Sequence, residues 1–237
     1  MIKYFLALAS IIFSAVLLPA QSKDDYDFYM SKSGKNAVLF RGSAPLVYSF
    51  KYTGTYFAYS PNYERGELRY NGKDYHNLEI NINSHQEEVY VRFNGSSIVV
   101  TLNNDFVEHF NTGNKYFINF TGDDKPGSPA PGYYQVLYRG NDKLYKKIKK
   151  TYIESVPQVY TGMAGNTLER SFKTSVAYYL LKGNVYYVIK NKASLVNIYK
   201  NEKREIGRFI RESNLNFYEF KDEAYVAIMN FVESGKR

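Results

Sequence analysis

The sequence has 237 residues, a formal net charge of +8 at pH 7 and no cysteine. The lack of cysteine excludes disulfide bonds, a thiol nucleophile and a bacterial lipoprotein anchor, so the core alone must stabilise the chain. The length suits one large domain or two small ones. The basic excess favours an anionic glycan, an anionic lipid or an acidic protein face as partner, or else only keeps the chain soluble.

Residues 1–20 predict a cleaved secretory signal peptide. A short basic start precedes the apolar run Tyr4–Leu18, and Pro19 and Ala20 end it with a small residue. The run is shorter than the roughly 20 residues of a membrane-spanning helix, although an uncleaved anchor is the alternative. We therefore expect an exported protein of the periplasm or the outer membrane. This compartment argues against nucleic acid as a partner.

Residues 21–154 are predicted to form an antiparallel β domain. Its start, 21–35, suits either a short helix or a flexible lead-in, and 36–41 is a candidate first strand. An aromatic-rich stretch, 46–58, follows. Apolar and polar residues then alternate through 66–102, which predicts a meander of four short strands.

The turn residues support this meander. Asn71-Gly72 and Asn94-Gly95 lie in gaps of the alternation. Both dipeptides suit type I′ hairpins, which need a positive φ at both central residues. Four further strands are expected at 106–110, 116–120, 133–138 and 143–152. The proline- and glycine-rich stretch 121–132 cannot form a regular element and predicts a long surface loop.

The predicted strand 143–152 concentrates positive charge. Five lysines are interleaved with two tyrosines, and the residues are Lys143, Tyr145, Lys146, Lys147, Lys149, Lys150 and Tyr152. Lysines often protect an edge strand against unwanted pairing, and an edge strand is our first interpretation. A stripe that binds an anionic ligand is the second.

Residues 155–166 predict a linker, and 167–237 a second part made of a hairpin and helices. The hairpin strands 176–181 and 185–189 carry Tyr178, Tyr179, Tyr186 and Tyr187. Three helical segments follow, at 193–199, from Asn201 to Asn214, and from Asp222 to Gly235. Asn201 and Asp222 are the expected N-caps, and Asn214 is expected to end its helix in the left-handed conformation. The predicted fold class is β-rich α+β: a meander or sandwich-like body, a hairpin and a short helical C-terminal cap.

Motifs for catalysis and for metal binding are weak in this sequence. His76, His85 and His109 lack the spacing of a local ligand pair. No G-x-S-x-G elbow, phosphate-binding loop or dinucleotide fingerprint occurs. Asp123-Asp124 lacks the alternating oxygen ligands of a calcium loop. We therefore expect neither a cofactor nor a metal, and we lean against an enzyme.

Two stretches resemble a group of uncharacterised exported proteins of the Bacteroidetes. One is Gly66–Leu78 followed by Glu88–Val91, and the other is Tyr178–Lys192 continuing into Lys203–Ile210 and Leu215–Phe217. The group pattern has valine where this chain has Leu68 and Leu78. The resemblance spans most of the mature chain and implies a Gram-negative envelope location. No activity and no site residue carry over from it.

These observations favour a binding or accessory protein of the cell envelope. It would contact another envelope macromolecule, most readily a protein or outer-membrane complex, through tyrosine- and lysine-rich surfaces. The expected contact residues are Lys143, Tyr145, Lys146, Lys147, Lys149, Lys150, Tyr178, Tyr179, Tyr186 and Tyr187. One alternative is a periplasmic carrier or sensor of a lipid-like ligand, and another is an envelope hydrolase that uses carboxylates.

Overall fold

The computed structural model describes residues 23–34, 37–93, 95–156 and 168–235. The chain divides into two compact units, Met1–Gly34 and Lys35–Arg237. The described part of the first unit is helix α1 (Lys23–Ser33), so the helical alternative for this stretch is correct. Asp24 and Asp25 in its first turn and Lys32 in its last turn complement the helix dipole. The predicted signal peptide, 1–20, lies outside the described residues.

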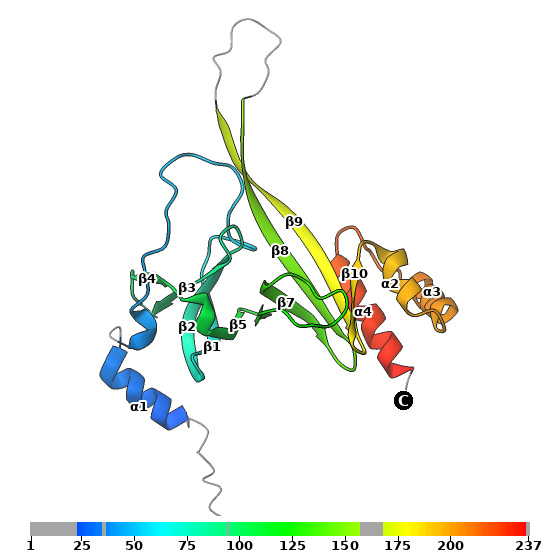
Figure 1. Cartoon of the computed structure of the whole chain (residues 1–237), viewed down its shortest axis with the longest axis horizontal. Coiled ribbons are helices and arrows are strands. Elements are labelled where there is room, and N and C mark those ends of the chain that lie inside the picture. The colour runs from blue at the N-terminus through cyan, green and yellow to red at the C-terminus, as the bar shows by residue number, and fades with distance from the viewer. Residues whose placement is uncertain (1–22, 35–36, 94, 157–167, 236–237) are drawn as a thin grey trace, which may run out of the picture. The chain divides into compact units, whose positions relative to one another are not determined.

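The second unit contains one antiparallel sheet of ten strands, ordered β10-β9-β8-β7-β6-β5-β1-β2-β3-β4 (Figure 1). The β-rich prediction with C-terminal helices is therefore confirmed. The strands are β1 (Glu64–Tyr70), β2 (Lys73–Asn83), β3 (Glu88–Phe93), β4 (Val99–Thr101), β5 (Val107–Thr112), β6 (Lys115–Phe120), β7 (Gly132–Arg139), β8 (Lys143–Ser155), β9 (Glu169–Lys182) and β10 (Val185–Ile189).

Strands β1 to β4 form the predicted meander. After β4 the chain returns through the 3-10 turn η3 (Asn104–Phe106) and places β5 beside β1, where a second meander, β5 to β10, begins. The turn prediction at Asn71-Gly72 is confirmed, because both residues have positive φ, 51° and 72°. In the other dipeptide Gly95 also has a positive φ, 76°, whereas Asn94 lies outside the described residues.

The predicted first strand at 36–41 is wrong. Val38–Phe40 forms the 3-10 turn η2, in which the Phe40 N–H donates to the Ala37 carbonyl at 2.9 Å. Ala37 and Leu39 are both buried, and the Phe40 ring lies 5.6 Å from Phe93 of β3, so this short apolar stretch packs against the sheet without joining it as a strand.

The predicted linker at 155–166 falls between β8 and β9, and most of it lies outside the described residues. Ser155 itself is the last residue of β8 and is paired with Glu169 of β9. The register between these two strands continues without a bulge to Lys143 and Leu181. The two sides of the predicted linker therefore belong to the same sheet, and together they form the long ribbon visible in Figure 1.

The three C-terminal helices are α2 (Lys192–Ile198), α3 (Lys203–Glu212) and α4 (Lys221–Ser234). Their predicted caps are partly wrong. Glu202, not Asn201, precedes α3 as its N-cap, and Phe220 precedes α4. Asp222 lies in the first turn of α4, where its carboxylate bonds side chains of the sheet instead. Asn214 does adopt the expected left-handed conformation, with a φ of 47°.

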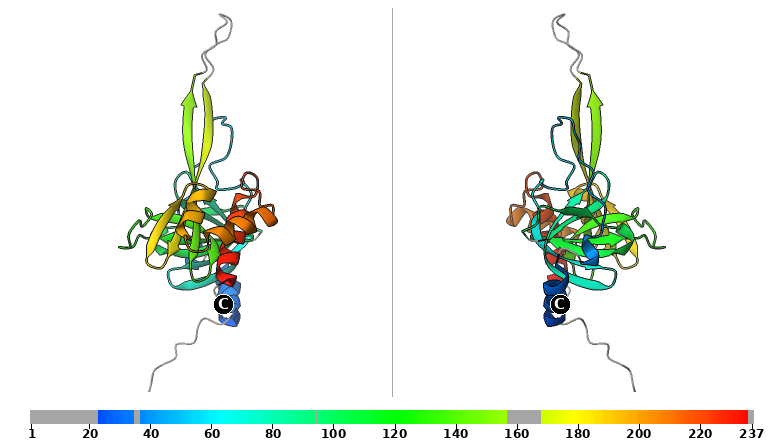
Figure 2. Two further views of the ribbon diagram at one scale, coloured as in Figure 1. Left: turned by 90° about the vertical axis from the view of Figure 1, so that its right-hand side faces the viewer. Right: turned by 90° about the vertical axis from the view of Figure 1, so that its left-hand side faces the viewer.

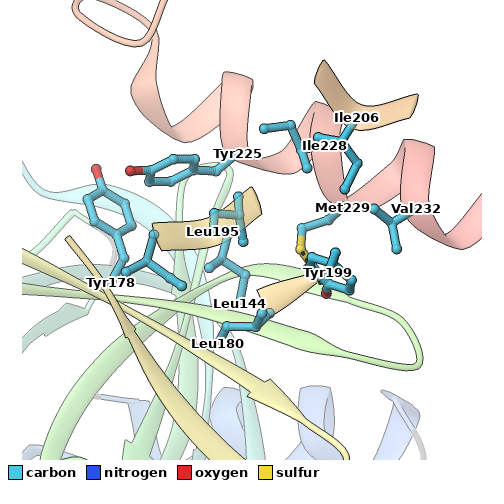
Figure 3. Packing of buried hydrophobic residues seen from close by; sticks show 11 residues of the cluster. Leu144, Tyr178, Leu180, Leu195, Tyr199, Ile206, Tyr225, Ile228, Met229 and Val232 are labelled. Atoms are coloured by element: carbon cyan, nitrogen blue, oxygen red, sulfur yellow. Dashed lines mark hydrogen bonds between the residues drawn. The ribbon is translucent and has the colours of Figure 1, made fainter. Parts of the chain in front are cut away.

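The helices cover one face of the sheet at its β7–β10 end (Figure 2). Their shared core is apolar and is drawn in Figure 3. The sheet contributes Leu144, Tyr178, Leu180 and Ile189, and the helical region contributes Leu195, Tyr199, Ile206, Tyr225, Ile228, Met229 and Val232. Each large side chain buried here contributes about 1.5–3 kcal/mol of hydrophobic stabilisation, which fixes the helices to the sheet.

The opposite face of this end carries a smaller core. Tyr134, Tyr145 and Tyr186 are buried there against partly buried apolar residues. The predicted loop between β6 and β7 closes over these rings. The Tyr134 hydroxyl donates to the Ala130 carbonyl at 2.7 Å, and the Tyr186 hydroxyl donates to Asp123 at 3.1 Å. Among the described residues, no helix is long and apolar enough to cross a membrane.

Candidate functional site

The candidate site is a layer of aromatic rings, which we call the aromatic surface. It comprises Tyr48, Phe50, Tyr52 and Tyr56 from the segment before β1, Tyr152 from β8 and Phe172 from β9. Tyr48 is its centre. The Tyr48 ring lies 5.2 Å from Phe172, 5.3 Å from Tyr56, 5.5 Å from Phe50, 5.9 Å from Tyr52, 6.3 Å from Tyr152 and 6.4 Å from His85, measured between ring centroids.

A few backbone hydrogen bonds place the segment that carries these rings. Thr53 forms a parallel bridge with Ser171 of β9, in which its N–H donates to the Arg170 carbonyl at 2.9 Å. Three residues later, the Tyr56 carbonyl accepts from the Ser84 N–H at 3.0 Å. These contacts lie at the C-terminal end of the segment. Its earlier part, Leu46–Tyr52, is held on the sheet by ring packing.

The aromatic surface is only partly buried. Phe172 is buried, but Tyr48, Phe50, Tyr52 and Tyr152 all keep part of their rings in solvent. The side chains just before them are more exposed, since Leu46 is 50% exposed and Val47 is 78% exposed. Half-buried tyrosines beside exposed aliphatic groups can pack against a partner while their hydroxyl groups form hydrogen bonds.

An ion pair between β9 and β8 lies beside these rings. The Arg170 guanidinium lies 4.7 Å from the centre of the Phe50 ring and forms a 3.0 Å ion pair with Glu154. Burial raises the pKa of the Tyr48 hydroxyl, with smaller contributions from Tyr52 and Glu88. The hydroxyl is therefore a neutral donor at physiological pH. Arginine and tyrosine together are the residue types that most often dominate binding at protein interfaces.

The lysines predicted as contact residues occupy different environments. Residues 143–146 of β8 pair with β7 on one side and with β9, beyond the predicted linker, on the other, so the edge-strand interpretation is wrong for Lys143 and Lys146. From Lys147 onward β8 pairs with β9 alone and has no described strand on its other side. Lys143 and Lys149 are exposed, whereas Lys146 and Lys150 are buried. Lys147 is half-buried and forms a 2.5 Å ion pair with Glu87.

The predicted tyrosines are also largely internal. Tyr178 is buried in the core under the helices, and Tyr145 and Tyr186 are buried on the opposite face. Tyr179 is partly buried beside them, and Tyr187 is 37% exposed. Of the ten predicted contact residues, only Lys143, Lys149 and Tyr187 are therefore exposed. They do not form one patch, because Tyr187 lies on the opposite face of the sheet from Lys143 and Lys149 is six residues farther along β8.

A second candidate is a cleft of about 490 Å³ between α4 and the sheet. Two of its lining residues bond a buried lysine: the Lys146 ammonium donates to Asp222 at 2.5 Å and to the Tyr59 hydroxyl at 3.3 Å. Burial lowers the pKa of Lys146, but Asp222 and Tyr59 outweigh it and hold the pKa above its ordinary value. The remaining lining mixes amide, charged and aliphatic groups: Asn114, Lys115, Gln135, Leu137, Glu223, Val226, Ala227 and Asn230.

The histidines lie apart from both candidates or at their margin. His76 and His109 line a small pocket of about 70 Å³ on β1, β2 and β5, where His76 Nδ1 lies 2.9 Å from Glu67. Burial lowers the pKa of His109. His85 packs against Phe172 at 5.2 Å at the rim of the aromatic surface. Within the described ranges, no group of three or more histidine, aspartate or glutamate side chains could hold a metal ion.

Comparisons with protein-family models, curated proteins and solved structures found no match to this chain. The site must therefore be interpreted from its own geometry.

Sequence reasoning noted the aromatic-rich stretch 46–58 but did not select it as a site. The missing information was its pairing with Ser171, more than a hundred residues later in the chain. One signal was present in the sequence. Aromatic residues at 48, 50 and 52 alternate with small or charged ones, but glycine and proline flank them, which argues against a regular strand.

Proposed function

We propose that this chain is a non-enzymatic binding protein of the cell envelope that contacts another protein through the aromatic surface. The observation that carries the proposal is the Tyr48-centred ring layer, half-buried and flanked by the exposed side chains of Leu46 and Val47. Its tyrosine, phenylalanine and arginine content is typical of the central part of a protein interface. The envelope compartment rests on the export that residues 1–20 predict.

The proposal moves the contact away from the residues first predicted. Tyr145, Tyr178 and Tyr186 stabilise the interior of the sheet end, and Lys146 and Lys150 are also buried. A partner could reach these groups only by unfolding the region. The aromatic surface needs no such rearrangement, because its rings already lie at the surface. The general function expected from the sequence is retained, whereas its location changes.

The test compares two full-length variants in the native host, each purified by affinity after mild crosslinking. Val47→Asp places a charge on the aromatic surface, where Val47 is 78% exposed. Tyr218→Ser is the control, because Tyr218 is 95% exposed but lies in the connection between α3 and α4. We expect the crosslinked partner of the unmodified protein to be lost from Val47→Asp and retained by Tyr218→Ser. Retention by both variants would contradict the proposal.

A second function is favoured by the cleft beside α4. A volume of about 490 Å³ falls in the range of small-molecule sites. Its lining combines Lys115 with the carboxylates of Asp222 and Glu223 and with three amides, which suits a polar ligand better than the lipid-like ligand suggested by the sequence. Native mass spectrometry of protein purified without detergent tests this function, and a protein free of any bound small molecule would count against it.

A further inference from the structure

Strand β9 has an edge that is paired at both ends and open in the middle. At its N-terminal end, the Phe172 N–H donates to the Thr53 carbonyl at 3.0 Å, and the Arg170 carbonyl accepts from Thr53. At its C-terminal end, Tyr178 is paired with Ile189 of β10. Backbone groups point alternately to the two sides of a strand, so the even-numbered residues of β9 face this edge.

Two residues between these ends therefore direct their backbone groups outward. Thr174 lies opposite Lys150 of β8. The Lys150 N–H donates to the Ser84 carbonyl at 3.0 Å, and its own carbonyl lies 3.0 Å from His85 Nδ1, so Lys150 does not use these groups to bond Thr174. The N–H and C=O of Thr174 consequently point away from β8, and those of Val176 follow by the same alternation.

This part of β9 is accessible. Residues 173–176 are all exposed, and Val176 is 44% exposed despite its apolar side chain. Thr174 keeps its side chain on the ribbon, where its hydroxyl accepts from the Lys150 ammonium at 2.7 Å. The side chains therefore leave the backbone edge open.

The outermost strands of the sheet, in contrast, are each covered at one point. On β4, the Thr101 N–H donates to the Ser43 carbonyl at 2.8 Å. On β10, the Tyr186 N–H donates to the Pro126 carbonyl at 2.9 Å. Native proteins commonly cover sheet edges in this way to prevent unwanted pairing. The gap on β9 has no such cover and lies next to Phe172 of the aromatic surface.

We propose that an extended segment of the partner protein adds to this gap as a short strand. The proposal rests on the proposed function and specifies its mode of binding. From Phe172 to Tyr178 the strand advances six residues, about 20 Å, which leaves room for roughly three paired residues. Main-chain hydrogen bonds to Thr174 and Val176 supply affinity, as in other cases of strand addition.

The two faces of the ribbon define the chemistry of that segment. The face that carries Thr174 and Val176 leads to the rings of the aromatic surface. The other face carries Lys173 on β9 and Lys149 on β8, both exposed. Successive side chains of an added strand point to opposite faces. The matching segment therefore alternates apolar or aromatic residues with aspartate or glutamate.

Proline substitutions test the main-chain bonds selectively. Thr174→Pro and Val176→Pro each remove an outward N–H that the β8–β9 ladder does not use, and proline is tolerated where a strand N–H faces solvent. Thr174→Val is the matched control, because it retains the N–H and removes only the hydroxyl. The probe is a pool of short synthetic peptides that alternate Val, Ile, Phe or Tyr with Asp or Glu, measured by calorimetry against the full-length protein.

We expect a peptide from the pool to bind the unmodified protein and Thr174→Val equally. Both proline variants should bind it about tenfold or more weakly, since each leaves a peptide carbonyl without its donor. Hydrogen exchange on the unmodified protein gives a second readout that needs no variant: the amides of Thr174 and Val176 should become protected when the peptide binds. Binding without this protection, or no binding by any peptide, would overturn strand addition.

The test of strand addition and the test of the proposed function can fail independently. Val47→Asp alters the aromatic surface but leaves the β9 edge intact. If the native partner is lost from Val47→Asp but retained by both proline variants, the aromatic surface is the interface and strand addition is wrong. If the partner is retained by Val47→Asp as well, the proposed function itself fails.

Discussion

Removing the Asp222 carboxylate should destabilise the protein because it leaves a buried ammonium without its partner. Lys146 is 9% exposed, and its ammonium lies 2.5 Å from Asp222. The second oxygen of Asp222 accepts from the buried Tyr178 hydroxyl at 2.7 Å. Breaking a fully buried ion pair costs 3–5 kcal/mol. Because the Asp222 side chain is 25% exposed, we expect Asp222→Ala to cost about 3 kcal/mol, at the low end of that range.

Urea unfolding followed by circular dichroism measures this effect. With an m-value of about 2 kcal/mol/M, the loss corresponds to a shift of roughly 1.5 M in the unfolding midpoint. The double variant Lys146→Met/Asp222→Ala is the control, since it removes both charges. It should recover part of the stability lost in Asp222→Ala, because an apolar replacement of a buried pair is often neutral. A loss below about 1 kcal/mol, or strict additivity of the two single variants, would refute the argument.

Three further predictions concern other contacts. Burial lowers the pKa of His109 below its ordinary value of 6.5, so the unfolded chain binds more protons and the free energy of unfolding should fall as the pH drops below that value. In urea titrations at several pH values, His109→Gln should reduce this loss of stability at low pH. An unchanged dependence of stability on pH would contradict the assignment to His109. Gly66→Ala should destabilise the protein by more than about 2 kcal/mol, because a Cβ there would lie 2.0 Å from a carbonyl oxygen of β5 and overpacking alone costs about 1–3 kcal/mol. In Gly72→Ala the added Cβ meets no atom, so the variant should cost only about 1 kcal/mol for its positive φ. Equal shifts of the melting temperature in the two variants would be inconsistent with this difference. Tyr199→Phe should cost about 1–3 kcal/mol in chemical denaturation, because the Tyr199 hydroxyl donates to buried Asp142 at 2.8 Å, and a neutral effect would show that Asp142 finds other donors.

Local sequence patterns predicted the strands well where the information was local. The alternation through 66–102 and the Asn71-Gly72 dipeptide predicted β1 to β4, because hairpin pairing depends on neighbouring residues and on the φ values of the turn. The same reasoning failed at 36–41. There a short apolar run packs as a 3-10 turn, and periodicity over so few residues cannot distinguish the two outcomes.

Long-range pairing explains the other errors. Lysines on β8 suggested an edge strand, but residues 143–146 pair with β7 on one side and with β9, which follows the predicted linker, on the other. Lys146 became a buried ion partner because α4, far along the chain, brings Asp222 to it. The aromatic surface likewise needs Phe172 to reach Tyr48. Such contacts depend on the topology of the whole sheet, which residue periodicity does not contain.

The junction between β1 and β5 has a consequence for how the chain folds. Every other ladder among the described strands joins neighbours in sequence, whereas Leu68 of β1 pairs with Phe110 of β5. Closing that pair requires a loop of about forty residues, and such closure is slow compared with the formation of a hairpin. We therefore expect the two meanders to assemble separately and the β1–β5 pairing to form after them. A chain cut or circularly permuted between β4 and β5 would keep every local hairpin. Any change in its folding rate would therefore arise from the pairing of β1 with β5.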